Sequence, residues 1–83
     1  MDKYTILLVD DEEEVIQAII RKINWEELGF SVVGYADNGI KALEMIEESQ
    51  PDVVMTDIKM QYMDGMELCS HIRREYPAMK IVL

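Results

Sequence analysis

The chain has 83 residues, of which 17 are acidic and 8 basic, so its formal net charge is −9. This length allows one small domain, and 49% hydrophobic with 30% charged residues is typical of a soluble globular protein. So negative a surface repels phosphate backbones and anionic lipids, which excludes direct contact of this segment with nucleic acid or a membrane. We expect no signal peptide, because the start of the chain lacks the basic segment and long apolar core of one, and no apolar run is long enough to span a bilayer. We therefore expect a cytoplasmic location.

Short apolar segments have the composition of buried strands. Residues 5–9 form a continuous apolar run, too short for a helix, which predicts a strand covered on both faces. Residues 31–36 and 53–56 are similar, and residues 81–83 predict the start of a fourth strand.

Between these strands, apolar residues recur at the three- and four-residue spacings of amphipathic helices, over residues 12–23, 40–48 and 64–76. The predicted apolar face of the third helix comprises Met66, Leu68, a half-buried Cys69 and Ile72. Residues 24–29 predict an additional short turn of helix with Gly29 as its left-handed end. We expect Trp25 and Leu28 to fold back onto the first helix.

Strands that alternate with helices predict an α/β fold, with a parallel sheet and helices on both faces. Ligands of such sheets bind beyond the carboxyl ends of the strands. The first strand ends in Asp10 and Asp11, and the third ends in Asp57. If these two strands are neighbours, three carboxylates meet at one edge of the sheet.

Three carboxylates so close together repel one another, so the cluster needs protons or a cation. Oxygen ligands with part of the coordination shell left open suit Mg²⁺, whereas zinc would call for cysteine or histidine. His71 lies in the third predicted helix, away from this edge. Each acid also has a simpler interpretation, because Asp10 and Asp11 could cap the first helix and Asp57 could be a solvated strand end.

Motifs in a fixed order carry a resemblance to a known family: Leu7-Leu8-Val9-Asp10-Asp11-Glu12, then Asn38-Gly39 with Ala42-Leu43, then Pro51-Asp52-Val53-Val54-Met55-Thr56-Asp57-Ile58-Lys59-Met60, then Met63-Asp64-Gly65. Through them the whole chain resembles the receiver domain of two-component response regulators, which has the CheY-like form of the flavodoxin-like fold. The resemblance implies a signalling switch rather than an enzyme.

The resemblance also implies roles for single residues. Asp57 matches the aspartate that accepts a phosphoryl group from a sensor histidine kinase. Asp11 matches the direct Mg²⁺ ligand, and Asp10 its acidic neighbour, which holds the metal through water. Lys59 matches the position that offers its backbone carbonyl to the metal, and its side chain lies where the family tunes the lifetime of the phosphorylated state.

Two departures from the family pattern matter. The family's loop commonly has a proline after the methionine at position 60, whereas this chain has Gln61, which is expected to loosen the loop. Lys59, Met60 and Gln61 are the residues expected to tune this loop. Residues 1–83 are expected to be a receiver domain incomplete at its carboxyl end, without the fifth strand, the fourth and fifth helices, and the family's hydroxyl and lysine partners of the phosphate. An unprotected edge at the third and fourth strands should then favour self-association.

The sequence also bears on the output domain of the parent protein and on two alternative functions. The insert at residues 24–30 resembles the receivers of regulators with an AraC-type DNA-binding domain, which implies control of transcription by a domain outside this segment. A haloacid-dehalogenase-like phosphohydrolase would need an aspartate two residues after its nucleophile, where this chain has Lys59. A receiver-like interaction domain that is no longer phosphorylated is the other alternative.

Overall fold

The computed structural model describes residues 3–60 and 63–83. Its elements in chain order are β1 (Tyr4–Val9), α1 (Glu13–Lys22), β2 (Phe30–Ala36), α2 (Gly39–Ser49), β3 (Val53–Thr56), α3 (Gly65–Glu75) and β4 (Lys80–Val82). The strands form one sheet in the order β2-β1-β3-β4, and every neighbouring pair is parallel. This arrangement confirms the predicted flavodoxin-like α/β fold.

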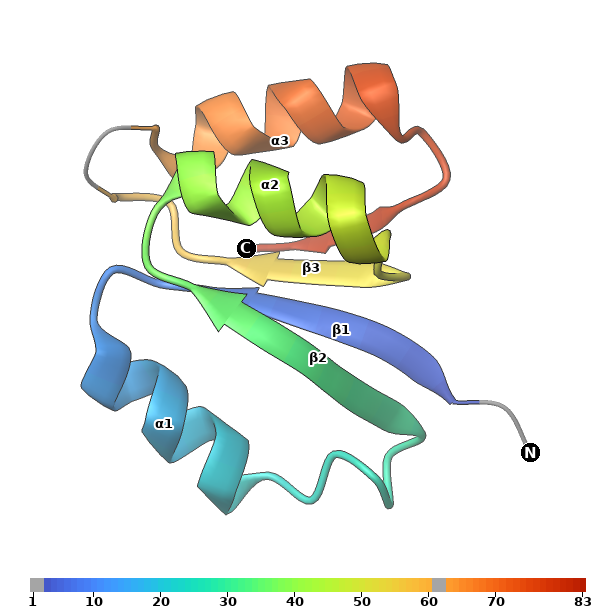
Figure 1. Cartoon of the computed structure of the whole chain (residues 1–83). Helices are drawn as coiled ribbons and strands as arrows, with labels where there is room; N and C mark the ends of the chain where they lie inside the picture. The colour runs from blue at the N-terminus through green and yellow to red at the C-terminus, as the bar shows by residue number, and fades with distance from the viewer. Residues whose placement is uncertain (1–2, 61–62) are drawn as a thin grey trace.

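Helices cover both faces of the sheet, with α1 on one face and α2 and α3 on the other (Figure 1). The continuous apolar run of β1 follows from this layering, because successive side chains of a strand point to opposite faces. Ile6 and Leu8 form a buried cluster with Ile16 of α1. Leu7 and Val9 belong to the larger cluster beneath α2 and α3. Within the described residues, no helix is long and apolar enough to cross a membrane.

The segment between α1 and β2 forms turns rather than the predicted extra turn of helix. Gly29 has a φ of +86°, so its predicted left-handed conformation is confirmed. Trp25 packs against the cluster that contains Ile16 and meets the ring of Phe30 edge to face, as expected for a residue that folds back onto α1. The expectation for Leu28 was wrong: in the turns of this segment the residue is 64% exposed.

The buried face of α3 consists of Leu68, Cys69 and Ile72. Cys69 is more deeply buried than predicted, and this burial raises the pKa of its thiol. The prediction for Met66 was wrong, because it lies in the first turn of α3 with its side chain 55% exposed. Its spacing from Cys69 suits either the edge of an apolar stripe or solvent, and periodicity alone does not separate the two.

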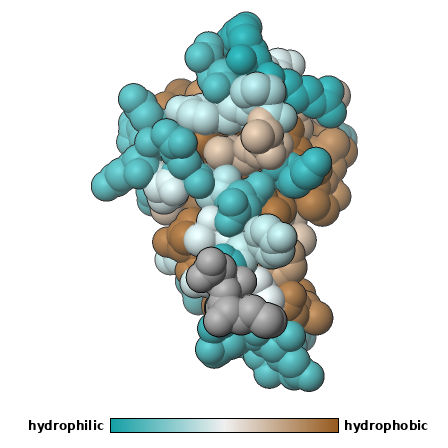
Figure 2. Space-filling model, turned by 90° about the vertical axis from the view of Figure 1, so that its right-hand side faces the viewer, coloured by the Kyte–Doolittle hydropathy of each residue, from teal (hydrophilic) through white to brown (hydrophobic). Residues whose placement is uncertain are grey.

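One aspartate joins three strands at the edge where the strands begin. The carboxylate of Asp52 accepts hydrogen bonds from the backbone N–H and the hydroxyl of Thr5, at 2.8 and 3.1 Å. The backbone carbonyl of Asp52 accepts from the N–H of Lys80 at 3.0 Å. This residue therefore ties β1 and β4 to the start of β3. Figure 2 looks onto this side of the molecule, where hydrophilic and hydrophobic groups are interspersed.

Truncation of Leu68 should destabilise the protein far more than truncation of Met66. Leu68 is fully buried, so Leu68→Ala removes apolar contacts and leaves a cavity, and we expect a loss of about 2–5 kcal/mol in the free energy of unfolding. Met66 is largely exposed, so Met66→Ala should change the free energy of unfolding by less than about 0.5 kcal/mol. Urea unfolding followed by circular dichroism measures both, and equal effects would contradict the orientation of α3.

Candidate functional site

The pairing of β1 with β3 brings the predicted acids together. Val9 lies opposite Thr56 in the parallel register, so Asp10 and Asp57 occupy the next places on adjoining strands. The Asp57 N–H donates to the Val9 carbonyl at 2.9 Å, and the Asp10 N–H donates to the Ala36 carbonyl at 3.1 Å. These two bonds extend the sheet by one step and hold both aspartates at its carboxyl edge.

Three carboxylates converge at this edge. One oxygen from each of Asp10, Asp11 and Asp57 lies within 4.8 Å of the others, and we call these residues the acid cluster. The sequence predicted this convergence, and the structure confirms it. Asp11 and Asp57 are exposed and Asp10 is half-buried, so the cluster opens to solvent.

Two hydrogen bonds hold Asp57, one to its carboxylate and one to its backbone carbonyl. One of its carboxylate oxygens accepts from the N–H of Ile58 at 2.8 Å. Its backbone carbonyl accepts from the hydroxyl of Thr56 at 2.9 Å, and Thr56 is the one buried polar side chain among the described residues. Sequence reasoning did not single out Thr56, because a threonine near the end of a strand is common.

Asp10 has a local structural role as well as its place in the cluster. One of its oxygens accepts from the N–H of Glu12 at 2.9 Å, and Glu12, the residue that precedes the helical residues of α1, makes no side-chain capping bond of its own. The alternative that Asp10 caps α1 is therefore not met, because its bond reaches the N–H of the residue before the helix and not one in the first turn. This local bond does not compete with membership of the cluster. A carboxylate has a second oxygen and further lone pairs available for a ligand.

The donor set of the acid cluster fits a hard divalent cation. It consists of oxygen atoms alone, since no cysteine or histidine belongs to it among the described residues. At about 4 Å and an effective dielectric constant of about 20, each carboxylate pair would repel by on the order of 4 kcal/mol, and solvent reduces this strongly at an exposed site. A dication would convert this repulsion into attraction, and three protein ligands leave room for water or a phosphate.

The loop after Asp57 is held tightly where it enters α3. The N–H of Gly65 donates to the Ile58 carbonyl at 2.7 Å. A Cβ atom on Gly65 would overlap the Asp57 carbonyl and lie 2.8 Å from the Cα of Ile58, so only glycine fits this position. The sequence placed Gly65 at the start of a helix and in a family motif, but it could not show the contact with Asp57, which depends on the tertiary path of the loop.

The three loop-tuning residues predicted from the sequence have different outcomes. The side chain of Lys59 is exposed, and the role of its backbone carbonyl stays a prediction. Met60 is half-buried and packs against the core beneath α2 and α3. Gln61 lies outside the described residues.

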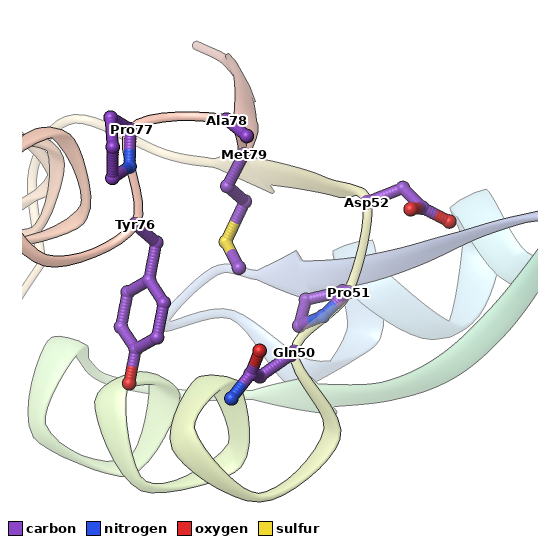
Figure 3. A pocket seen from close by; sticks show the side chains of 7 residues that line it. All are labelled: Gln50, Pro51, Asp52, Tyr76, Pro77, Ala78 and Met79. Carbon is purple, nitrogen blue, oxygen red and sulfur yellow. The ribbon is translucent and has the colours of Figure 1, made fainter.

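A hollow of about 340 Å³ at the opposite edge of the sheet does not compete as the functional site. Figure 3 shows its lining, which comes from the segment between α2 and β3 and the segment between α3 and β4, with one acid, Asp52. The Asp52 carboxylate already accepts two hydrogen bonds from Thr5. A smaller hollow of about 190 Å³ adjoins the acid cluster and is lined in part by Asp10, Asp57 and Thr56.

The doubly wound parallel sheet and the acids at its carboxyl edge define a flavodoxin-like domain with its polar site at the strand ends. Residues 6–83 match the family described as response regulator receiver domain. The chain belongs to this family, as the resemblance implied.

Individual relatives agree with this assignment. The chain is 41% identical over 80 residues to the uncharacterized transcriptional regulatory protein YesN of Bacillus subtilis (strain 168), an alignment that covers 96% of this chain and 22% of YesN. It is 44% identical over 78 residues to protein-glutamate methylesterase/protein-glutamine glutaminase 3 of Hahella chejuensis (strain KCTC 2396), covering 94% of this chain and 22% of that protein.

The fold matches that of solved receivers equally well. The crystal structure of a two component transcriptional regulator AraC from Clostridium phytofermentans ISDg superimposes with a TM-score of 0.87 at 38% identity, covering 95% of this chain and 64% of that chain. This chain therefore spans 22% of the length of the two relatives above and under two thirds of this solved structure.

Replacement of Asp11 by asparagine should change the effect of Mg²⁺ on stability. Without divalent ions, Asp11→Asn should be slightly more stable than the wild type, by no more than about 1 kcal/mol, because it relieves repulsion at an exposed site. With saturating Mg²⁺ the order should reverse, because the wild type gains stability in proportion to its affinity for the ion. Thermal unfolding in EDTA and in Mg²⁺ measures both arms.

Asp37→Asn is the matched control for this experiment. Asp37 follows the end of β2 at the same edge of the sheet but does not belong to the acid cluster, so its removal subtracts the same charge. We expect this variant to keep the stabilisation by Mg²⁺. Equal losses in the two variants would mean that the ion responds to total charge and not to the cluster.

Proposed function

We propose that this chain is the phosphoacceptor module of a response regulator, in which Asp57 receives a phosphoryl group from a sensor histidine kinase. The convergence of Asp10, Asp11 and Asp57 at one sheet edge carries the proposal. Membership of the receiver family supports it. The site acts as a signalling switch and not as an enzyme that turns over a substrate.

In the proposed transfer, Asp57 is the nucleophile. The oxygen bonded to the Ile58 N–H is held in place, so the second carboxylate oxygen attacks phosphorus. The bond between phosphorus and the histidine nitrogen of the kinase breaks, its electron pair returns to the imidazole, which takes up a proton, and an acyl phosphate forms on Asp57. The contribution of the receiver is therefore to orient one carboxylate and to tolerate the charge that arrives.

Asp10 and Asp11, with the oxygens of Asp57 and the backbone carbonyl of Lys59, are the proposed ligands of Mg²⁺. Bound there, Mg²⁺ would neutralise charge on both the carboxylate and the phosphoryl oxygens. Asp11 is exposed and suited to direct contact. Asp10 keeps one oxygen on the Glu12 N–H, which suits the predicted contact through water.

The two rival functions have less support. A haloacid-dehalogenase-like phosphohydrolase would need a second acid two residues after Asp57, and the exposed Lys59 lies there instead. A receiver-like interaction domain without phosphorylation would not need three repelling carboxylates at one edge, and the cluster is intact.

We further propose that the parent protein regulates transcription through a separate DNA-binding domain, in the cytoplasm. This proposal is supported by the similarity of this chain to a transcriptional regulatory protein and to a two component transcriptional regulator. The methylesterase relative shows that similar segments also occur in longer proteins named as enzymes. The acidic composition of this segment agrees with DNA contact elsewhere.

The predicted self-association through β3 and β4 also stays a proposal. In the described sheet β4 is an edge strand, and the side chain of Val82 is 44% exposed. An apolar edge strand can pair with an edge of a second chain.

Incubation with acetyl phosphate and Mg²⁺ tests the phosphoacceptor proposal directly. We expect an increase in intact mass equal to one phosphoryl group, abolished by Asp57→Asn and by EDTA but kept in Asp37→Asn. Acid-stable or multiple modification would contradict an acyl phosphate on Asp57. Continued release of inorganic phosphate without a modified protein would favour the hydrolase, and absence of both would favour the interaction domain.

A further inference from the structure

A glycine at the start of α2 touches the loop that leaves the acceptor aspartate. Gly39 is the first residue of α2 and is buried. A Cβ atom there would lie 2.5 Å from the backbone carbonyl oxygen of Met63 and 2.6 Å from its Cβ. Real Cβ atoms do not approach backbone atoms so closely, so any side chain at this position must displace the loop or the helix.

The start of α2 is fixed and cannot yield easily. The side chain of Asn38 accepts from the N–H of Lys41 at 2.8 Å and caps the helix. Ala42 and Ile46, further along α2, are fully buried in the core beneath the helix. A side chain at Gly39 would therefore push Met63, and not α2.

Met63 is one of the points that fix the loop. Its side chain packs against the core beneath α2 and α3, as does that of Met60 on the limb that leaves Asp57. At the far end, Gly65 closes against Ile58 through its N–H. The described parts of the loop are thus fixed by the packing of Met60 and Met63 against the core. They are also fixed by two backbone contacts, of Met63 with Gly39 and of Ile58 with Gly65.

We propose that Gly39 is a positioning residue for the metal site, because the bare backbone at the start of α2 sets how closely the loop bearing Lys59 approaches the acid cluster. This inference rests on the proposed function, in which the Lys59 carbonyl is a Mg²⁺ ligand. A displaced Met63 also shifts Gly65, two residues further on, whose N–H donates to the carbonyl of Ile58, the residue before Lys59. The Lys59 carbonyl is then displaced, while Asp10 and Asp57, whose N–H groups are bonded to neighbouring strands, keep their positions.

Gly39→Ala tests the proposal, with Gly34→Ala as its control. Gly39→Ala should weaken Mg²⁺ binding by roughly tenfold, the lower end of what is lost when the support of a metal ligand is removed. At Gly34 an added Cβ would meet the Cε of Met45 at 2.6 Å, and this flexible end can move aside. Gly34→Ala should therefore keep the wild-type affinity for Mg²⁺, although its added Cβ approaches a neighbouring atom about as closely as that of Gly39→Ala.

Two readouts separate positioning from damage to the fold. Mg²⁺ affinity is measured by titration under amide-resolved NMR, and the free energy of unfolding by urea without Mg²⁺. We expect the amide shift of Lys59 in Gly39→Ala to move before any Mg²⁺ is added, while the shifts of Asp10 and Asp57 stay close to the wild type. An unchanged Lys59 amide, or unchanged affinity, would overturn the inference.

A second pair of variants covers the case in which Gly39→Ala does not fold. Met63→Ala removes the packing of the loop from the other side of the contact, and it should also weaken Mg²⁺ binding. Met66→Ala removes an exposed methionine nearby and should not. Equal affinities in this pair would likewise overturn the inference, whereas a wild-type protein that binds no Mg²⁺ would refute the proposed function instead.

Discussion

The parallel pairing of β1 with β3 is the constraint on which the site depends. Val9 lies opposite Thr56, and this register carries Asp10 and Asp57 one step beyond the sheet on adjoining strands. A shift of one residue would turn Asp57 to the other face, because side chains alternate along a strand. The two core clusters hold the register in place, since Leu7 and Val9 must meet one helix layer while Ile6 and Leu8 meet the other. Burial of β1 on both faces therefore fixes the positions of acids that are themselves solvent-accessible.

The acid cluster works against stability, and the structure compensates with local bonds. Asp57 is oriented by the N–H of Ile58, and Asp10 by the N–H of Glu12. Each bond assigns one oxygen to the backbone and leaves the other for a ligand. In the proposed function, the repulsion that remains would favour a bound cation and would change when a phosphoryl group arrives. A site with such repulsion responds to a change of charge, which is what a switch requires.

Much of the fold and the acids of the site could be predicted from the sequence, because both follow from local patterns. Uninterrupted apolar runs ending in aspartate predicted the buried strands and their carboxyl ends. The predictions for Leu28 and Met66 were wrong, because an apolar residue at helical spacing does not reveal whether the helix continues or which side its first turn presents. The glycine contacts at Gly39 and Gly65 join segments distant in the chain or folded back on themselves, so no local pattern could show them. The carbonyl of Lys59 stays a prediction from family resemblance.

Paramagnetic relaxation by Mn²⁺ tests most directly whether the three carboxylates form one cation site. Mn²⁺ prefers oxygen ligands as Mg²⁺ does, and it broadens the NMR signals of nearby amides. The account predicts that substoichiometric Mn²⁺ first broadens the amides of Asp11, Ile58 and Lys59, and that excess Mg²⁺ restores them. The amides of Asp52 and Tyr76, at the opposite edge, should keep their intensity. Equal broadening at both edges, or broadening confined to the exposed Glu44, Glu47 and Glu48 of α2, would contradict a specific site at Asp10, Asp11 and Asp57.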